Sequence, residues 1–199
     1  MITLTLFSAL ATFYFTMFIT PGPNNAMLTA SGLKFGFLRT LPHAIGIPLG
    51  HIAQIGITCF GLANLFLIYP QVQFYMKILC FLYLLYLAWT MLGSFSMVQK
   101  ETGRPLKFYE ASIFQFVNPK AWSIAVTVAS GFFPSEENIF IGVAFVTVTA
   151  AVICFPSICV WALFGSGLRK FVTNLRVKKT IEYLLAILLV LTGLFILLK

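Results

Sequence analysis

Two proline-containing motifs hold most of the residues in this sequence that could take part in chemistry. The first is Pro21, Gly22, Pro23, Asn24 and Asn25. Proline lacks a backbone donor and clashes with the preceding helical turn, while glycine permits unusual backbone angles, so these residues must end or break a helix. A helix that restarts here presents N–H groups and partial positive charge, which favour an anion such as a carboxylate. The motif therefore indicates either an ordinary turn or a broken helix that lines a cavity.

The second motif contains a lysine in an otherwise apolar segment: Gln115, Asn118, Pro119 and Lys120. Lys120 lies ten residues after Glu110, which at about 1.5 Å per residue places it roughly 15 Å along a helix that begins there. If that helix crosses a membrane, the ammonium group lies near the bilayer centre at a cost of about 2.5–3.5 kcal/mol, so we expect it to face a cavity or a partner. The partner could be carbonyl groups freed at Pro119 or Pro21, or an anionic ligand. Alternatively, the helix begins later and Lys120 extends toward the membrane surface.

His51 is the third candidate, because an imidazole can gain and lose a proton near neutral pH. It is the one imidazole well inside an apolar segment, since His43 lies near an edge. Its two interpretations are a proton carrier and a hydrogen-bonded structural histidine. Gly46 and Gly50 precede it with the spacing that lets two helices approach closely, so we expect them to pack against another helix.

The sequence lacks the residues that metal or cofactor chemistry would need. Its five acidic residues are all glutamates, which excludes paired-aspartate catalysis and argues against a hard-metal site. The four cysteines fall in apolar segments without a metal-binding spacing. A phosphate-binding loop of the GxxxxGKS/T type is also missing, so this chain does not hydrolyse ATP. We therefore expect no cofactor and no metal.

Composition indicates the kind of protein that must position these residues. Hydrophobic residues make up 60% of the 199 and charged residues 9%, against about 45–50% and about 25% in soluble domains. These values exclude a soluble enzyme domain and a disordered protein, and they indicate a membrane protein. The net charge is +8, but the charged residues lie between apolar blocks. Lipid headgroups therefore explain the basic residues better than nucleic acid does.

Uncharged stretches show where the chain would cross the membrane. Residues 40–76, 78–99 and 138–168 form uncharged stretches of 37, 22 and 31 residues, and a spanning helix needs about 20. In lipid, every backbone N–H and C=O group needs a hydrogen-bond partner within the protein, and a helix provides these partners within one segment. The sequence predicts an all-α polytopic protein with six transmembrane helices: Leu4–Thr20, His43–Ile68, Val72–Ser94, Glu110–Phe133, Ile139–Phe164 and Thr180–Leu198.

The basic residues predict the orientation of these helices. Loops 1–2, 3–4 and 5–6 share one side of the membrane and carry ten lysines and arginines, whereas loop 4–5 carries Glu136 and Glu137. Because cytoplasmic loops are enriched in basic residues, we expect these three loops in the cytoplasm and both termini outside.

Weak internal similarity suggests that the chain is a duplicated unit. Pro119 follows Pro21 by 98 residues, and Gly193 follows Gly93 by 100. Residues 1–97 and 108–199 would each contain three spans. Because three is odd, the second copy would begin on the other side of the membrane, and the two copies would have opposite orientations. The sequence therefore predicts one transporter domain, residues 1–199, built as a 3+3 inverted repeat, whose site lies where interrupted helices meet near the membrane centre.

Together these features resemble the signature of the LysE/RhtB family of amino-acid exporters. The likeness rests on Thr20-Pro21-Gly22-Pro23-Asn24-Asn25, on Gly46 and Gly50, on Phe114-Gln115-Phe116-Val117-Asn118-Pro119-Lys120, and on the basic segment before the last span. It covers essentially the whole chain and is strongest toward the branch that exports cysteine and O-acetylserine. The resemblance implies a transporter of the bacterial inner membrane driven by the proton gradient. One departure is His51, where many members carry an acidic or amide residue.

The residues and the resemblance lead to one transport hypothesis. A zwitterionic amino acid enters from the cytoplasm, Lys120 holds its carboxylate, and carbonyl groups near Pro21 and Pro119 hold its ammonium group. His51 carries the returning proton. Four amide side chains could surround the substrate: Asn24, Asn25, Gln115 and Asn118.

The expected partners are an amino acid, protons and membrane lipid, with no nucleic acid; an oligomer is compatible with the sequence. Two other functions stay open. A passive channel would need rings of charge or filter carbonyl groups, and a membrane enzyme would need a nucleophile, a metal or an acid–base pair.

Overall fold

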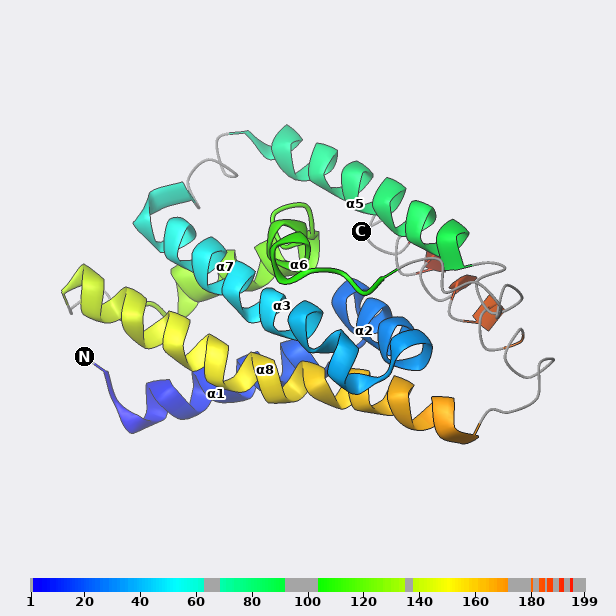
Figure 1. The fold of residues 1–199 in the computed structure, drawn as a ribbon. Coiled ribbons are helices and arrows are strands. Elements are labelled where there is room, and N and C mark those ends of the chain that lie inside the picture. Colours follow the sequence, from blue (N-terminus) through cyan, green and yellow to red (C-terminus); the bar gives the residue numbers. More distant parts are fainter. Residues whose placement is uncertain are drawn as a thin grey trace.

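The computed structural model describes residues 2–62, 69–91, 104–134 and 138–171, with a few more between 180 and 194. Every regular element in these ranges is a helix, which confirms the predicted all-α class (Figure 1). The elements are α1 (Leu4–Ile19), α2 (Pro23–Phe35), α3 (Phe37–Ile57), the π-helical turn η1 (Thr58–Leu62), α5 (Pro70–Met91), α6 (Phe108–Phe114), α7 (Pro119–Gly131) and α8 (Ile139–Phe171).

Two of the described helices are long and apolar enough to cross a membrane unbroken: Phe37–Gly61 and Ile139–Leu168. A third candidate is the bent pair of α1 and α2. The predicted span Val72–Ser94 falls on α5, whereas Thr180–Leu198 lies largely outside the described residues. The count of six transmembrane spans and the inverted repeat therefore stay predictions.

The first broken helix consists of α1 and α2, which bend by 53° at the break between them. The hydroxyl of Thr3 caps α1 by accepting a hydrogen bond from the Leu6 N–H at 3.1 Å. Pro23 opens α2 at the first helical position, where the missing N–H has no helical partner to lose. Of the two alternatives that the motif left open, the structure thus shows a broken helix and not an ordinary turn.

The sequence prediction was wrong for the segment between this break and His43. It placed this segment outside the spans, whereas the structure shows it to be helical. α2 runs to Phe35, and α3 begins at Phe37, six residues before the predicted start. Lys34 and Arg39 suggested a loop, but they lie beside the corner between two helices. Gly36 makes that corner with a φ of 83°, a backbone angle that favours glycine.

Two further boundaries differ from the prediction. The expected span Glu110–Phe133 is divided into α6 and α7 by residues 115–118, because Pro119 cannot continue the first helix. α8 continues beyond the expected end at Phe164 to Phe171, so Arg169 and Lys170 belong to its last turn.

Glycines bring the helices together closely. A Cβ atom at Gly50 would lie 2.5 Å from the Ser112 carbonyl oxygen, and one at Gly46 would meet the backbone of the first turn of α6. Gly32 and Gly165 make the same kind of contact between α2 and α8. α8 also packs along α1 and α3. The two broken helices are thus held against the long helices α3 and α8.

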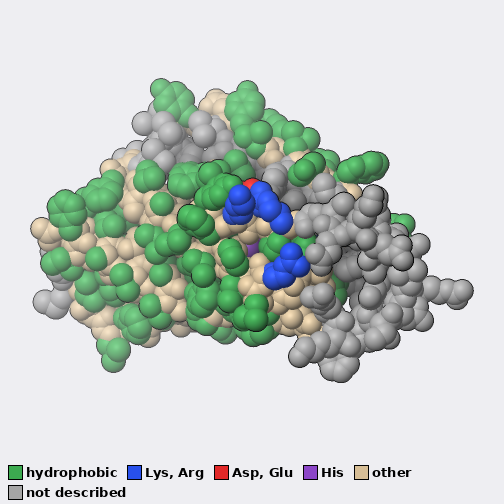
Figure 2. Space-filling model, in the orientation of Figure 1, with side chains coloured by type: hydrophobic (Ala, Val, Ile, Leu, Met, Phe, Trp, Pro, Cys, Tyr) green, Lys and Arg blue, Asp and Glu red, His purple; other side chains and the backbone are tan. Residues whose placement is uncertain are grey.

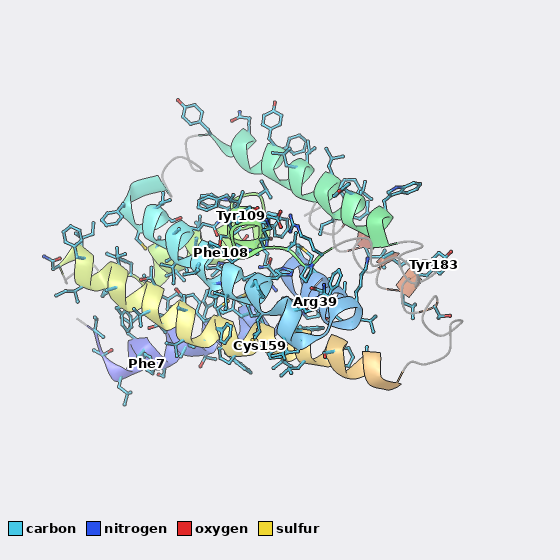
Figure 3. The ribbon with its side chains drawn as sticks, in the orientation of Figure 1. Phe7, Arg39, Phe108, Tyr109, Cys159 and Tyr183 are labelled. Atoms are coloured by element: carbon cyan, nitrogen blue, oxygen red, sulfur yellow. The ribbon has the colours of Figure 1, made fainter. Side chains whose placement is uncertain are left out.

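The helix ends define two ends of the molecule. α2, α3 and α6 meet at an end that carries Lys34, Arg39, Arg104 and Lys107, which we call the basic end. Figure 2 shows Lys and Arg side chains in two small groups on a face that is otherwise largely hydrophobic, and Figure 3 labels Arg39 near the corner of α2 and α3. At the opposite end the Phe60 ring lies 6.2 Å from that of Phe140 on α8.

Candidate functional site

Lys120 joins the two broken helices. Its Nζ atom donates hydrogen bonds to the Thr20 carbonyl at 2.9 Å, the Thr20 hydroxyl at 3.0 Å and the Pro21 carbonyl at 3.2 Å. Gly22 leaves room for this side chain, since a Cβ atom there would lie 3.0 Å from Lys120 Cδ. Of the partners considered for Lys120, the structure shows carbonyl groups at the first break. They follow the C-terminal end of α1, which carries partial negative charge.

Side chains from other elements satisfy the remaining carbonyl groups at this end of α1. Asn25 Nδ2 donates to the carbonyls of Phe18 and Thr20 at 2.8 and 2.7 Å. The indole N–H of Trp161, on α8, donates to the Ile19 carbonyl at 3.1 Å. These bonds matter because a carbonyl group without a partner is costly in lipid. The end of α1 is therefore completed by α2, α7 and α8 together.

The second break satisfies its backbone N–H groups locally. The N–H groups of residues 115–118 donate to carbonyls between Ser112 and Gln115. Asn118 caps α7 by accepting from the Lys120 N–H at 3.1 Å. The indole N–H of Trp122 donates to the Phe116 carbonyl at 2.8 Å. This break is therefore a compact turn that places Lys120 at the start of α7.

A pair of amide side chains forms a second link between the breaks. Asn24 Nδ2 donates to Gln115 Oε1 at 2.8 Å, and Gln115 Nε2 donates back to Asn24 Oδ1 at 3.2 Å. Gln115 is fully buried, and its Nε2 also donates to the Ala111 carbonyl at 2.8 Å. Four of the predicted site residues thus meet in two contacts across about a hundred residues of sequence: Asn24 with Gln115, and Pro21 with Lys120.

A small cavity of about 20 Å³ lies beside Lys120. This volume holds about one water molecule. Its walls come from α1, α2, α3, α7 and α8 and from Gly22 in the first break: Met17, Phe18, Gly22, Pro23, Asn24, Asn25, His51, Asn118, Lys120, Ala121, Ile124 and Ile158.

His51 is the one imidazole in this wall. Its side chain is 2% exposed, its Nδ1 has no hydrogen-bond partner, and its ring lies edge-on to Phe18 with centroids 5.1 Å apart. A buried nitrogen without a hydrogen-bond partner lowers the stability of the folded protein.

The arrangement suits recognition of a zwitterion. In the cavity wall, Lys120 offers an ammonium donor, and the amides of Asn24 and Asn118 offer both donors and acceptors. The carbonyl acceptors of Thr20 and Pro21 lie outside this wall, against Lys120 Nζ. The cavity wall includes no carboxylate. Within the described ranges, no group of His, Cys, Asp and Glu could hold a metal ion.

Sequence reasoning missed two residues of this site. Thr20 supplies two of the three oxygen atoms around Lys120, and its place directly before Pro21 is a signal that could have identified it. Trp161 completes the end of α1, but nothing in its apolar surroundings distinguishes it. Gly46 and Gly50 lie outside the cavity wall and pack α3 against α6.

Known proteins are similar to this chain over most of its length. The cysteine/O-acetylserine efflux protein of Salmonella paratyphi A is 30% identical over 162 residues, which cover 80% of this chain and 82% of the relative. The protein of the same name from Escherichia coli K12 is 30% identical over 163 residues, or 81% and 83% of the two chains. No solved structure matches the chain. Residues 15–199 match the family described as LysE type translocator, and the chain therefore belongs to this family of membrane transport proteins.

Proposed function

We propose that this protein exports a neutral amino acid or amino-acid derivative from the cytoplasm in exchange for protons, with cysteine and O-acetylserine as the first candidates. The names of its relatives support this substrate class. The observation that carries the proposal is the position of Lys120. Its ammonium group lies where two broken helices meet, beside a cavity that also contains His51.

The substrate carboxylate binds Lys120 and the start of α2. α2 begins at Pro23 without a side-chain cap from Gly22, so the partial positive charge of its N-terminus faces the cavity. The substrate ammonium group binds the carbonyls of Thr20 and Pro21, which Lys120 occupies in this structure. Binding therefore draws Lys120 from the carbonyls toward the carboxylate.

The size of the cavity implies a conformational change. A volume of about 20 Å³ is too small for an amino acid, so the cavity must enlarge before substrate binds. In the predicted orientation the basic end faces the cytoplasm. Substrate enters from that end, and a rocking motion between the halves of the chain then opens the cavity to the outside.

The residues of the cavity wall indicate which substrate side chains the site favours. Lys120 gives the site a positive charge, and a cationic substrate side chain would meet no carboxylate in the cavity wall. Met17, Ile124 and Ile158 give the wall an apolar part, which suits a neutral substrate side chain. We therefore expect neutral amino acids to be exported in preference to lysine or arginine.

Efflux from membrane vesicles tests the function. Vesicles containing the protein are loaded with labelled cysteine or O-acetylserine, and release is followed with and without a proton gradient. We expect Lys120→Met to lower export at least about tenfold, as for the loss of a hydrogen bond to a charged group. Lys107→Met is the matched control, because Lys107 is exposed at the basic end. Wild-type export by Lys120→Met would remove Lys120 from the site.

The role of His51 is tested in the same vesicles. His51→Gln keeps a polar side chain of similar size but cannot carry a proton at neutral pH. We expect export by this variant to lose its dependence on the proton gradient, while exchange of labelled for unlabelled substrate continues. Uphill export at the wild-type rate would show that another group carries the proton.

A further inference from the structure

Asn24 and Gln115 lie between the cavity and the basic end. Asn24 is at the start of α2 and Gln115 directly follows α6, and both of these half-helices lead to the basic end. Asn24 is part of the cavity wall, whereas Gln115 lies behind it. Their two hydrogen bonds, at 2.8 and 3.2 Å, therefore link the start of α2 to the end of α6 beside the cavity.

α3 packs tightly behind this pair. A Cβ atom at Gly50 would lie 2.6 Å from Gln115 Cγ, so the glycine is what lets α3 approach the glutamine. Gln54 Nε2 donates to the Gln115 carbonyl at 3.1 Å, and Gln115 itself is 0% exposed. Three helices, α2, α3 and α6, thus meet around the Gln115 side chain while the amides are paired.

We propose that Asn24 and Gln115 are the gate of the cavity toward the basic end, and we call them the amide gate. The proposal rests on the proposed function for the identity of the cavity as a transport site. Its chemistry suits a gate that must open repeatedly. Both amides are neutral, and each can exchange its partner for water or for a polar solute, so the net cost of separating them is modest.

The contact on Lys120 differs from the amide gate in position and chemistry. It links α7 to the end of α1, the two half-helices that lead away from the basic end. It also involves a charged group and three oxygen atoms. A solute from the basic end thus meets the amides first and Lys120 second, which gives the two contacts separate roles in admission and binding.

Accessibility of a reporter cysteine tests the amide gate without any need for transport. The four native cysteines are replaced by alanine, and Ala121→Cys, buried in the cavity wall, is the reporter. A membrane-impermeant thiol reagent is added to each face of the membrane in turn. We expect each single variant, Asn24→Ala or Gln115→Leu, to speed labelling from the membrane face at the basic end. The increase should be about tenfold, as for the loss of two neutral hydrogen bonds.

Two further variants make the result specific. The exchange Asn24→Gln with Gln115→Asn keeps the combined reach of the pair, so we expect it to restore slow labelling. Ser31→Ala is the matched control, because the Ser31 and Thr40 hydroxyls form another buried contact between helices, 2.9 Å long and away from the cavity. If Ala121→Cys does not insert, Ile124→Cys, one turn further along α7, replaces it as the reporter.

Equal labelling of the wild type and the two single variants from the basic face would overturn the amide gate, as would a failure of the exchanged pair to restore protection. These outcomes are independent of the substrate. Vesicles that export no amino acid would refute the proposed function and leave the labelling result standing. Export with unchanged labelling would refute the amide gate alone.

Discussion

The two breaks in this protein solve the same problem in different ways. Each interrupts a helix in an apolar region, and each is followed by a helix with proline at its first position, Pro23 in α2 and Pro119 in α7. Residues 115–118 bond their N–H groups within a local turn, and Asn118 caps the next helix. Side chains contribute here as well, since Gln54 and Trp122 donate to two carbonyls of this turn. The first break has no such turn, and its carbonyls depend on side chains from α2, α7 and α8.

This difference separates a fixed support from an adaptable site. The second break keeps its shape through its own hydrogen bonds, so it can hold Lys120 in place. The first break presents carbonyl groups whose partners come from elsewhere and can be exchanged for the ammonium group of a substrate. We infer that the first break changes its bonding during transport, and that the second does so much less. The following substitutions test this comparison.

Asparagine substitutions are expected to give the largest difference in stability. Asn25→Ala leaves the Phe18 carbonyl without a partner and weakens the bonding of Thr20, which we expect to cost about 3 kcal/mol. Asn118→Ala removes a helix cap, at a cost of about 1 kcal/mol. Thermal unfolding in detergent, followed with a thiol-reactive dye, measures both. Equal shifts in Tm would contradict the distinction between the breaks.

Glycine substitutions are expected to have the next largest effects. One should lower the stability of the protein, and the other should lower its rate of export. A Cβ atom at Gly50 would meet the Ser112 backbone, so we expect Gly50→Ala to cost about 2 kcal/mol through overpacking. A Cβ atom at Gly22 would meet only the end of the Lys120 side chain, at 3.0–3.1 Å. Gly22→Ala should therefore unfold near the wild-type temperature but export more slowly. The reverse pattern would show that the first break is the rigid one.

The two indole caps allow a smaller, matched comparison. Trp161→Phe and Trp122→Phe each remove one N–H bond to a carbonyl, that of Ile19 in the first break and that of Phe116 in the second. Each change should cost about 1 kcal/mol. We expect export to fall more in Trp161→Phe, because Ile19 adjoins the carbonyls that bind the substrate. Identical export rates would argue against a special role for the first break.

The smallest effect is expected at the start of the second broken helix. Arg104 forms an ion pair with Glu110, which also accepts a hydrogen bond from the Lys107 N–H at 2.8 Å. Arg104 is exposed, and exposed ion pairs contribute little and are screened by salt. We expect Arg104→Gln to export within about twofold of the wild type. A larger loss that persists at high salt would give this end of α6 a part in transport.

The sequence located both breaks because their causes are local, although it left a turn open for the first and counted Glu110–Phe133 as one span. Proline ends a helix wherever it removes a donor, so Pro21, Pro23 and Pro119 identify both sites without any knowledge of the fold. The partners of Lys120 could be narrowed to carbonyl groups or an anion, because no acidic residue lies in the core of the predicted spans.

Features that depend on distant residues could not be predicted. Asn24 pairs with Gln115 across 91 positions, and neither residue carries a local sign of the other. The helical segments around Lys34 and Arg39 were missed because charge was taken to mean a loop, whereas these charges lie beside a glycine corner at the basic end. Single sequences show where a helix must stop more clearly than where it resumes.

The oxygen atoms around Lys120 belong to two carbonyl groups and a hydroxyl, none of which carries a formal charge. The ammonium charge is therefore surrounded by dipoles but not cancelled. A rearrangement that changes the depth of this charge in the bilayer works with or against the membrane voltage, which acts with about 2.3 kcal/mol per elementary charge per 100 mV. Export of a substrate with no net charge is thus expected to respond to voltage as well as to the pH difference.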